Sequence, residues 1–111
     1  MEVRTKSFFS KLKRITQKND ILLIADEVAC GAGRCGNYFA SNVVGFRPDI
    51  VTMGKSISSG ILPVSALFAH KKIWTALRKN NSDFSHNQTF INHPIAATAA
   101  EKVLDLSLIH I

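Results

Sequence analysis

Cysteine is scarce in this sequence, with Cys30 and Cys35 as the two thiols. Two thiols are too few for the disulfide framework that stabilises small secreted domains, so a reducing compartment is expected. The sequence also lacks an apolar run of the roughly 18–20 residues that a membrane helix needs. Residues 1–20 are polar and basic and lack the apolar core of a signal peptide. These absences predict a cytoplasmic protein that does not bind a membrane.

Acidic residues are outnumbered, because eight Asp and Glu stand against fourteen Lys and Arg, for a net charge of +6. Six of the basic residues fall in the first 18 positions: Arg4, Lys6, Lys11, Lys13, Arg14 and Lys18. A charge run of this kind is usually the solvated face of a helix. The sequence contains no nucleic-acid-binding module, so nucleic acid is not an expected partner. With 46% hydrophobic and 20% charged residues in 111, the composition indicates a single globular domain.

Three apolar segments are predicted to be strands, namely Ile21–Ala25, Ile50–Met53 and Val64–Ala69. The unbroken apolar run of the first is typical of a strand covered on both faces, as in a parallel sheet. A helix followed by such a strand is half of a βαβ unit. We therefore predict an α/β fold, a three-layer and mostly parallel sheet with flanking helices.

Helical signals lie between these strands. Phe8, Phe9, Leu12 and Ile15 recur at helical spacing and predict an amphipathic helix that ends at Asn19-Asp20. Residues 70–79 predict a short helix. Pro94 is expected to begin an alanine-rich helix that runs to Leu104, because proline costs nothing in a first helical turn.

The first predicted strand runs directly into Asp26-Glu27-Val28. Carboxylates at the end of a buried strand are costly unless a cation meets them. A helix cap or an acid in a loop is the alternative, but no turn residue separates these acids from the strand. We therefore expect them to have a positively charged partner.

Lys55 follows the second predicted strand at Gly54, and small polar residues and Gly60 come next. Ligands of open α/β sheets bind beyond the carboxyl ends of the strands, so Lys55 is expected to project into a crevice. A desolvated lysine amine attacks carbonyls and forms Schiff bases. An exposed surface lysine is the alternative for this residue.

Glycines at positions 31, 33 and 36 match the dinucleotide-binding pattern G-x-G-x-x-G. That pattern requires the glycines to lie directly between strand and helix, whereas Asp26–Cys30 intervene here. We interpret these glycines as a tight loop that lets the backbone pass close to a ligand or partner. Gly54-Lys55-Ser56 is also not a P-loop, since Asp49 occupies the position of the required first glycine.

A metal site is not expected. Cys30, Cys35, His86 and His93 have the spacings C-x4-C and H-x6-H, which lie outside the usual zinc-finger patterns. Packed thiols and hydrogen-bonded loop histidines are the alternative interpretation.

Several of these motifs occur together in one order. Leu23-Ile-Ala-Asp-Glu-Val28 precedes Gly31-x-Gly33-Arg34-x-Gly36, then come Pro48-Asp49-Ile50 with Gly54-Lys55, and then Gln88-Thr89-Phe90 with His93-Pro94. In this combination the sequence resembles the class III pyridoxal-phosphate aminotransferases, the ornithine and ω-amino-acid transaminase group of fold type I. The resemblance extends from Phe8 to Asp105.

The resemblance implies an enzyme that transfers an amino group from a small-molecule amino donor to a 2-oxo acid with pyridoxal 5'-phosphate as cofactor. It implies that Lys55 forms the Schiff base with the cofactor and that Asp26 pairs with the pyridinium nitrogen. It further implies that Val28 packs against the cofactor ring. Thr89 would bind the cofactor phosphate across the interface of a homodimer.

Elementary chemistry supports the same pair of residues. The cofactor withdraws electrons best when its ring nitrogen is protonated, so a carboxylate must hold that proton while a lysine presents the reactive carbon. Asp26 and Lys55, each at a strand end, supply these two groups. Lys55, once freed by the substrate, can move the proton between the substrate carbon and the cofactor carbon.

Parts of the family pattern are absent from this sequence. These are the glycine-serine phosphate loop, the stacking aromatic and the carboxylate-binding arginine, and family members are several times longer. We therefore expect residues 1–105 to be a partial cofactor-binding large domain that is inactive alone, and 106–111 to be a non-native tail. A catalytically dead fragment that acts as a binding or scaffold module is the alternative, but the intact Asp26 and Lys55 favour an enzyme.

Overall fold

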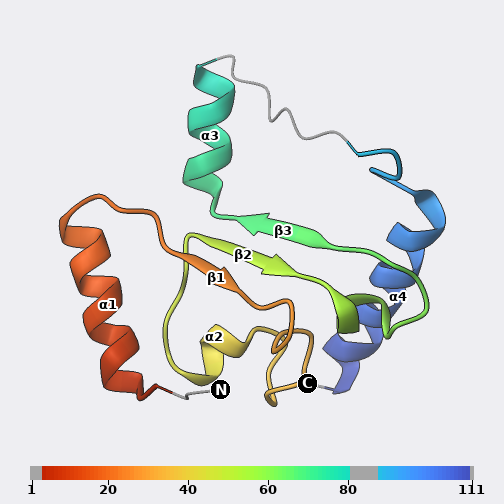
Figure 1. The fold of residues 1–111 in the computed structure, drawn as a ribbon, viewed down its shortest axis with the longest axis horizontal. Coiled ribbons are helices and arrows are strands. Elements are labelled where there is room, and N and C mark those ends of the chain that lie inside the picture. The colour runs from red at the N-terminus through yellow and green to blue at the C-terminus, as the bar shows by residue number, and fades with distance from the viewer. Residues whose placement is uncertain (1–3, 81–87, 111) are drawn as a thin grey trace.

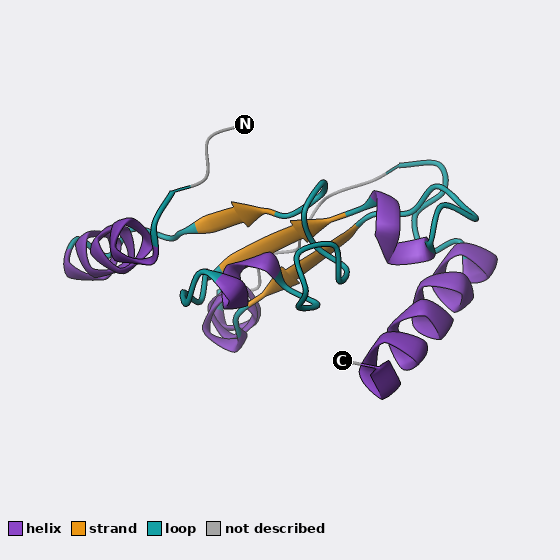
Figure 2. Ribbon diagram, turned by 90° about the horizontal axis from the view of Figure 1, so that it is seen from below, coloured by secondary structure: helices purple, strands orange, loops and turns teal. Residues whose placement is uncertain are grey.

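The computed structural model describes residues 4–80 and 88–110. Eight elements follow one another along the chain (Figure 1): α1 (Lys6–Lys18), β1 (Ile24–Asp26), α2 (Ala40–Val43), β2 (Ile50–Met53), the 3-10 helix η1 (Lys55–Ser58), β3 (Ala66–Ala69), α3 (Lys71–Lys79) and α4 (Pro94–His110). Helices α1 and α4 lie at opposite ends of the sheet in both Figure 1 and Figure 2. No helix among these residues is both long and apolar enough to cross a membrane.

Helix α1 confirms the predicted amphipathic helix. Thr5 caps its first turn, because its Oγ1 accepts a hydrogen bond from the Phe8 N–H at 3.3 Å. Phe9, on the apolar side, stacks on Phe46 with 4.9 Å between the ring centroids. The helix ends at Asn19, and Asp20 takes a left-handed conformation with a φ of 53°. The turn chemistry of Asn19-Asp20 thus ends the helix as predicted.

The three strands form one sheet in the order β1-β2-β3, so the prediction that they are neighbours is confirmed. Strands β1 and β2 are parallel, with Asp26 opposite Thr52, whereas β2 and β3 are antiparallel, with Ile50 opposite Ala69. The described sheet is therefore mixed, and the expectation of a mostly parallel sheet is wrong for these strands. Parallel neighbours need a long crossover, usually an α-helix, and only η1 and a loop join β2 to β3.

Two strands and one helix differ in length from their predictions. β1 begins at Ile24 instead of Ile21, because its partner strand β2 begins only at Ile50. The Leu23 carbonyl, just before β1, accepts the N–H groups of Asp49 and Ile50. β3 begins at Ala66 instead of Val64. Helix α4 continues past Leu104 to His110, so it is longer than predicted.

The buried core of the described residues is small. Tyr38, Val51, Met53 and Ile57 form its centre, and Met53 is 1% exposed. Ala100 and Leu104 of α4 pack against this cluster. Many large apolar side chains remain at the surface, among them Ile24 at 59% and Ile109 at 75% exposed. The chain therefore presents much more apolar surface than a self-contained domain usually does.

Asp49 joins four parts of the fold. Its carboxylate accepts hydrogen bonds from Lys72 Nζ of α3 at 2.7 Å, from Lys13 Nζ of α1 at 3.2 Å and from the Leu23 N–H at 3.0 Å. Burial alone would raise the pKa of Asp49, but the bonds from Lys72, Leu23 and Lys13 outweigh it and lower this pKa from 3.8 to about 2. This carboxylate thus holds α1 and α3 against the sheet.

Candidate active site

Lys55 stands where β2 ends. The strand ends at Met53, Gly54 continues in an extended conformation, and Lys55 begins η1 in the left-handed region with a φ of 47°. A left-handed non-glycine residue costs on the order of 1–3 kcal/mol and persists only where its surroundings hold it. The tight turn predicted after this lysine is present, since Ser59 and Gly60 also have positive φ values of 53° and 77°.

Lys55 opens into a large cavity, as the sequence predicted. The cavity has a volume of about 980 Å³ and lies between the η1–β3 connection and the beginning of α4. Leu62, Pro63 and Val64 line one side of it. Gln88, Phe90 and His93 line the other. Lys55 is among the residues that line this cavity, and it is exposed, which is also what the surface-lysine alternative expects.

Asp26 lies at the same edge of the sheet as Lys55. It is the last residue of β1, and β1 runs parallel to β2, so both strands present their carboxyl ends together. Asp26 Oδ1 accepts hydrogen bonds from Thr52 Oγ1 and from the Val28 N–H, each at 3.1 Å. Among the described residues Oδ2 has no hydrogen-bond partner. The carboxylate is therefore oriented through one oxygen and open at the other.

Val28 lies beside the strand end that carries Lys55. A Cβ added to Gly54 would be 3.5 Å from Val28 Cγ1, which places this side chain in ordinary contact distance of the Gly54 backbone. Val28 is half-buried. The structure thus brings Asp26, Val28 and Lys55 to one edge of the sheet.

Thr89 lies in a turn before α4 and is exposed. Its neighbours Gln88 and Phe90 line the Lys55 cavity, whereas Thr89 is not among the lining residues. The structure therefore does not bring Thr89 together with Lys55 within one chain.

Glu27 does not have the positively charged partner that the sequence predicted. It is 3% exposed, and its two carboxylate oxygens accept the N–H groups of Ala40 at 2.7 Å and Ser41 at 2.8 Å. Backbone amides of α2, not a cation, satisfy this acid. The helix-cap interpretation, set aside for Asp26-Glu27, is right for Glu27. This cap was hard to predict from the sequence, because α2 has four residues and no apolar period.

The glycine loop is as tight as predicted. Gly33 and Gly36 have φ values of 88° and 85°, and Ala32 also has a positive φ of 53°. Burial, followed by the nearby Glu27 carboxylate and the Cys35 thiol, raises the pKa of the Cys30 thiol. The described cysteines are free, and the described residues contain no cluster of three or more metal-ligating side chains.

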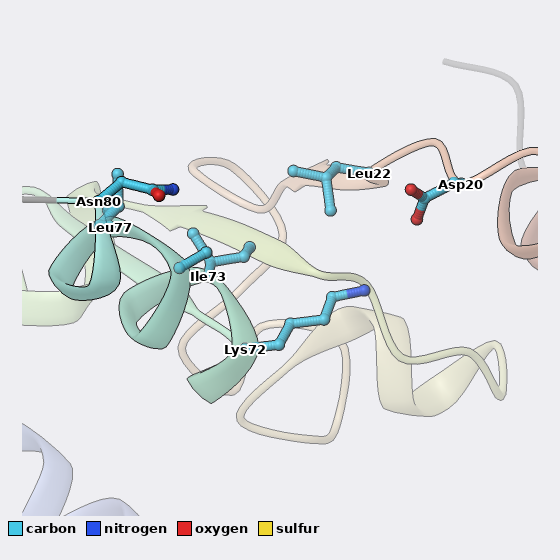
Figure 3. A pocket seen from close by; sticks show the side chains of 7 residues that line it. Asp20, Leu22, Lys72, Ile73, Leu77 and Asn80 are labelled. Atoms are coloured by element: carbon cyan, nitrogen blue, oxygen red, sulfur yellow. The ribbon is translucent and has the colours of Figure 1, made fainter. Parts of the chain in front are cut away.

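A second cavity lies between the α1–β1 connection and α3 (Figure 3). Its volume is about 330 Å³, and its walls are mostly apolar, including Leu22, Ile73 and Leu77. Its polar residues are Asp20, Lys72 and Asn80. Lys72 is already paired with Asp49. We therefore place the candidate active site at Lys55 and not here.

Comparison with known proteins shows the family of this chain. The sequence model of the class-III aminotransferases matches residues 1–108, so the chain belongs to this family. A vanillin aminotransferase of Capsicum frutescens is 37% identical over 103 residues, which are 90% of this chain and 22% of that protein. An adenosylmethionine-8-amino-7-oxononanoate aminotransferase of Staphylococcus aureus is 39% identical over 101 residues, 88% of this chain and 22% of that protein.

The fold is that of the same enzymes. A thermostable (S)-enantioselective ω-transaminase from Thermomicrobium roseum matches with a TM-score of 0.89 and 34% identity over 97% of this chain and 24% of that one. The resemblance drawn from the motifs is thereby confirmed. The chain spans about a fifth of the length of the curated relatives it matches, 22% in both cases above.

Proposed function

We propose that this chain is part of an aminotransferase that moves an amino group from an amino acid or amine to a 2-oxo acid, with pyridoxal 5'-phosphate held on Lys55. One observation carries the proposal: Asp26 and Lys55 leave parallel neighbouring strands at one edge, and Lys55 opens into a cavity of about 980 Å³. Membership of the class-III aminotransferases supports the cofactor.

The residues present fit this cofactor. A primary amine at the cavity meets the requirement for covalent attachment, and the open Oδ2 of Asp26 can take a hydrogen bond from a protonated ring nitrogen. Val28 offers an apolar side chain at the same edge. When bound, the cofactor supplies an electron sink that stabilises negative charge at the substrate carbon.

The chain's own residues then have distinct roles. Asp26, oriented by Thr52 and the Val28 N–H, holds the proton on the ring nitrogen. Val28 limits the position of the ring. Lys55 would hold the cofactor through its amine and, when free, would carry a proton at Nζ between the substrate carbon and the cofactor carbon.

Thr89 has a role that requires a second copy of the enzyme. Its exposure and its absence from the Lys55 cavity support binding of the phosphate held by the partner subunit of a homodimer. Residues 1–105 would then form part of a three-layer large domain that other segments complete. Because the exposed apolar surface is extensive, residues 1–111 alone are expected to be inactive.

The test is the site of covalent attachment in the full-length enzyme. Borohydride reduction followed by peptide mapping should place the cofactor on Lys55. Lys55→Ala should lose the label and all turnover while still binding the cofactor, and Lys71→Ala, an exposed lysine of α3, should retain both. Label on another lysine would refute the assignment. An unlabelled, inactive protein would favour the non-catalytic scaffold instead.

A further inference from the structure

The glycine loop reaches the turn that carries Lys55. Arg34 lies in this loop, and its Nη2 donates a hydrogen bond to Ser56 Oγ at 2.9 Å. Ser56 is the residue immediately after Lys55. On the other side of Lys55, the loop contacts Met53 through Gly31. Two points of the loop therefore touch Ser56, immediately after the reactive lysine, and Met53, two residues before it.

The loop itself is firmly held. The Gly31 N–H donates to the Glu27 carbonyl and the Ala32 N–H to the Tyr38 carbonyl, each at 2.8 Å. A Cβ at Gly31 would lie 2.9 Å from both the Glu27 carbonyl oxygen and Met53 Cε, so the backbone is packed as closely as glycine allows. Glu27 and Tyr38 are buried. Arg34 thus extends from a fixed support.

The turn that receives this bond needs support. Lys55 is left-handed, and η1 has four residues with short-range bonds from Ile57 to Gly54 and from Ser59 to Ser56. Ile57 and Ser58 anchor the far end of η1 in the core. The Arg34–Ser56 bond holds the near end, next to Lys55, from outside the turn.

We propose that Arg34 is a positioning residue for Lys55, acting through Ser56 to keep η1 in the conformation that presents the amine to the cavity. Arg34 does not line that cavity itself. The inference rests on the proposed function, because it concerns how Lys55 takes up the cofactor. The planar guanidinium is suited to the task, since it donates in a fixed direction that a lysine ammonium does not reproduce.

The test measures how fast Lys55 takes up the cofactor in the full-length apoenzyme, followed by visible absorbance after mixing with pyridoxal 5'-phosphate. Arg34→Ala should slow this step about tenfold, equivalent to about 1.4 kcal/mol, with the melting temperature of the apoenzyme little changed. Ser56→Ala should slow it equally, and the double variant should be no slower than either single variant, because one interaction has been removed. Arg14→Ala, an exposed arginine of α1, should match the wild type.

The outcomes separate the two proposals. If wild-type Lys55 takes up no cofactor, the proposed function fails. If the wild type labels at Lys55 while Arg34→Ala and Ser56→Ala react at the same rate, only the positioning role is overturned. Full rescue by Arg34→Lys together with a silent Ser56→Ala would also overturn it, since charge alone would then suffice. Should Arg34→Ala fail to fold, Ser56→Ala, which deletes one hydroxyl, carries the same expectation.

Discussion

Asp26 stands opposite Thr52 across the parallel β1–β2 ladder, and Thr52 Oγ1 donates to Asp26 Oδ1 at 3.1 Å. The partner strand therefore orients the carboxylate that we assign to the cofactor ring. The hydroxyl belongs to β2, the strand that leads into Lys55, so the two assigned groups are linked through one strand pair.

Replacing Asp26 by Asn should leave cofactor attachment to Lys55 intact but lower kcat by about a hundredfold or more, the scale of a lost proton-holding group. The amide cannot keep the ring nitrogen protonated. Thr52→Val, which keeps the shape but removes the hydroxyl, should cost less, about tenfold. Steady-state kinetics and the visible spectrum of the full-length enzyme check both. An Asp26→Asn enzyme with wild-type kcat would contradict the role.

Asp49 should make the free energy of unfolding depend on pH in the acid range. Its pKa is about 2 in the folded chain against an ordinary 3.8, so its contribution is complete above the unfolded pKa and is lost as the pH falls through 3.8 toward 2. The free energy of unfolding of the wild type should exceed that of Asp49→Asn by on the order of 2 kcal/mol at neutral pH. This difference should shrink across that acid range in urea titrations of the full-length enzyme.

Asp105 offers the matched control for this measurement. It pairs with Lys102 at 3.2 Å, but its side chain is 53% exposed, and such surface pairs contribute little. Asp105→Asn should therefore differ from the wild type by less than about 0.5 kcal/mol. A difference for Asp49→Asn that stays constant down to the lowest pH would show that its carboxylate is not the acid-sensitive group.

Glu27→Ala should destabilise the fold without touching the cofactor directly. The substitution leaves the Ala40 and Ser41 N–H groups without their acceptor at a buried position. We expect a loss of about 2–3 kcal/mol in the free energy of unfolding. Glu27→Gln keeps one acceptor oxygen and should lose less. Glu101→Ala, on the exposed side of α4, is the control, and equal effects at both sites would argue against the capping role.

Thr89→Ala should weaken retention of the cofactor phosphate while attachment to Lys55 still occurs. The loss should be about 1–3 kcal/mol, as for a hydrogen bond to a charged group. Equilibrium dialysis of the full-length enzyme measures it. Thr98→Ala is the matched control, because Thr98 Oγ1 donates to the Pro94 carbonyl of its own helix. Equal cofactor affinity in all three proteins would mean that the Thr89 loop does not reach the phosphate.

The placement of Asp26 and Lys55 was predictable from the sequence because two apolar runs each end in a residue with reactive chemistry. Neighbouring parallel strands bring such ends to one edge. The antiparallel direction of β3 depends on the short η1 connection, which no apolar period reveals.

Other features depend on contacts that local patterns do not encode. Arg34 meets Ser56 across 22 positions of sequence, and Glu27 meets Ser41 across 14. The left-handed Lys55 backbone is a further case, because lysine has no intrinsic preference for it. Such features follow from how the loop, α2 and η1 pack together.

The network around Asp49 also bears on the order in which the chain acquires its structure. Two of its partners precede it in sequence, with Leu23 26 positions away and Lys13 36 positions away. The entropy lost in closing a loop grows only slowly with its length, so these spans cost little more to close than shorter ones. Once Lys72 has left the ribosome, the Asp49 carboxylate can bind α1, α3 and the segment that leads into β1. The turn at Lys55 lies beyond the other end of β2 and needs α4 as well, because Ala100 and Leu104 pack against the cluster that contains Ile57.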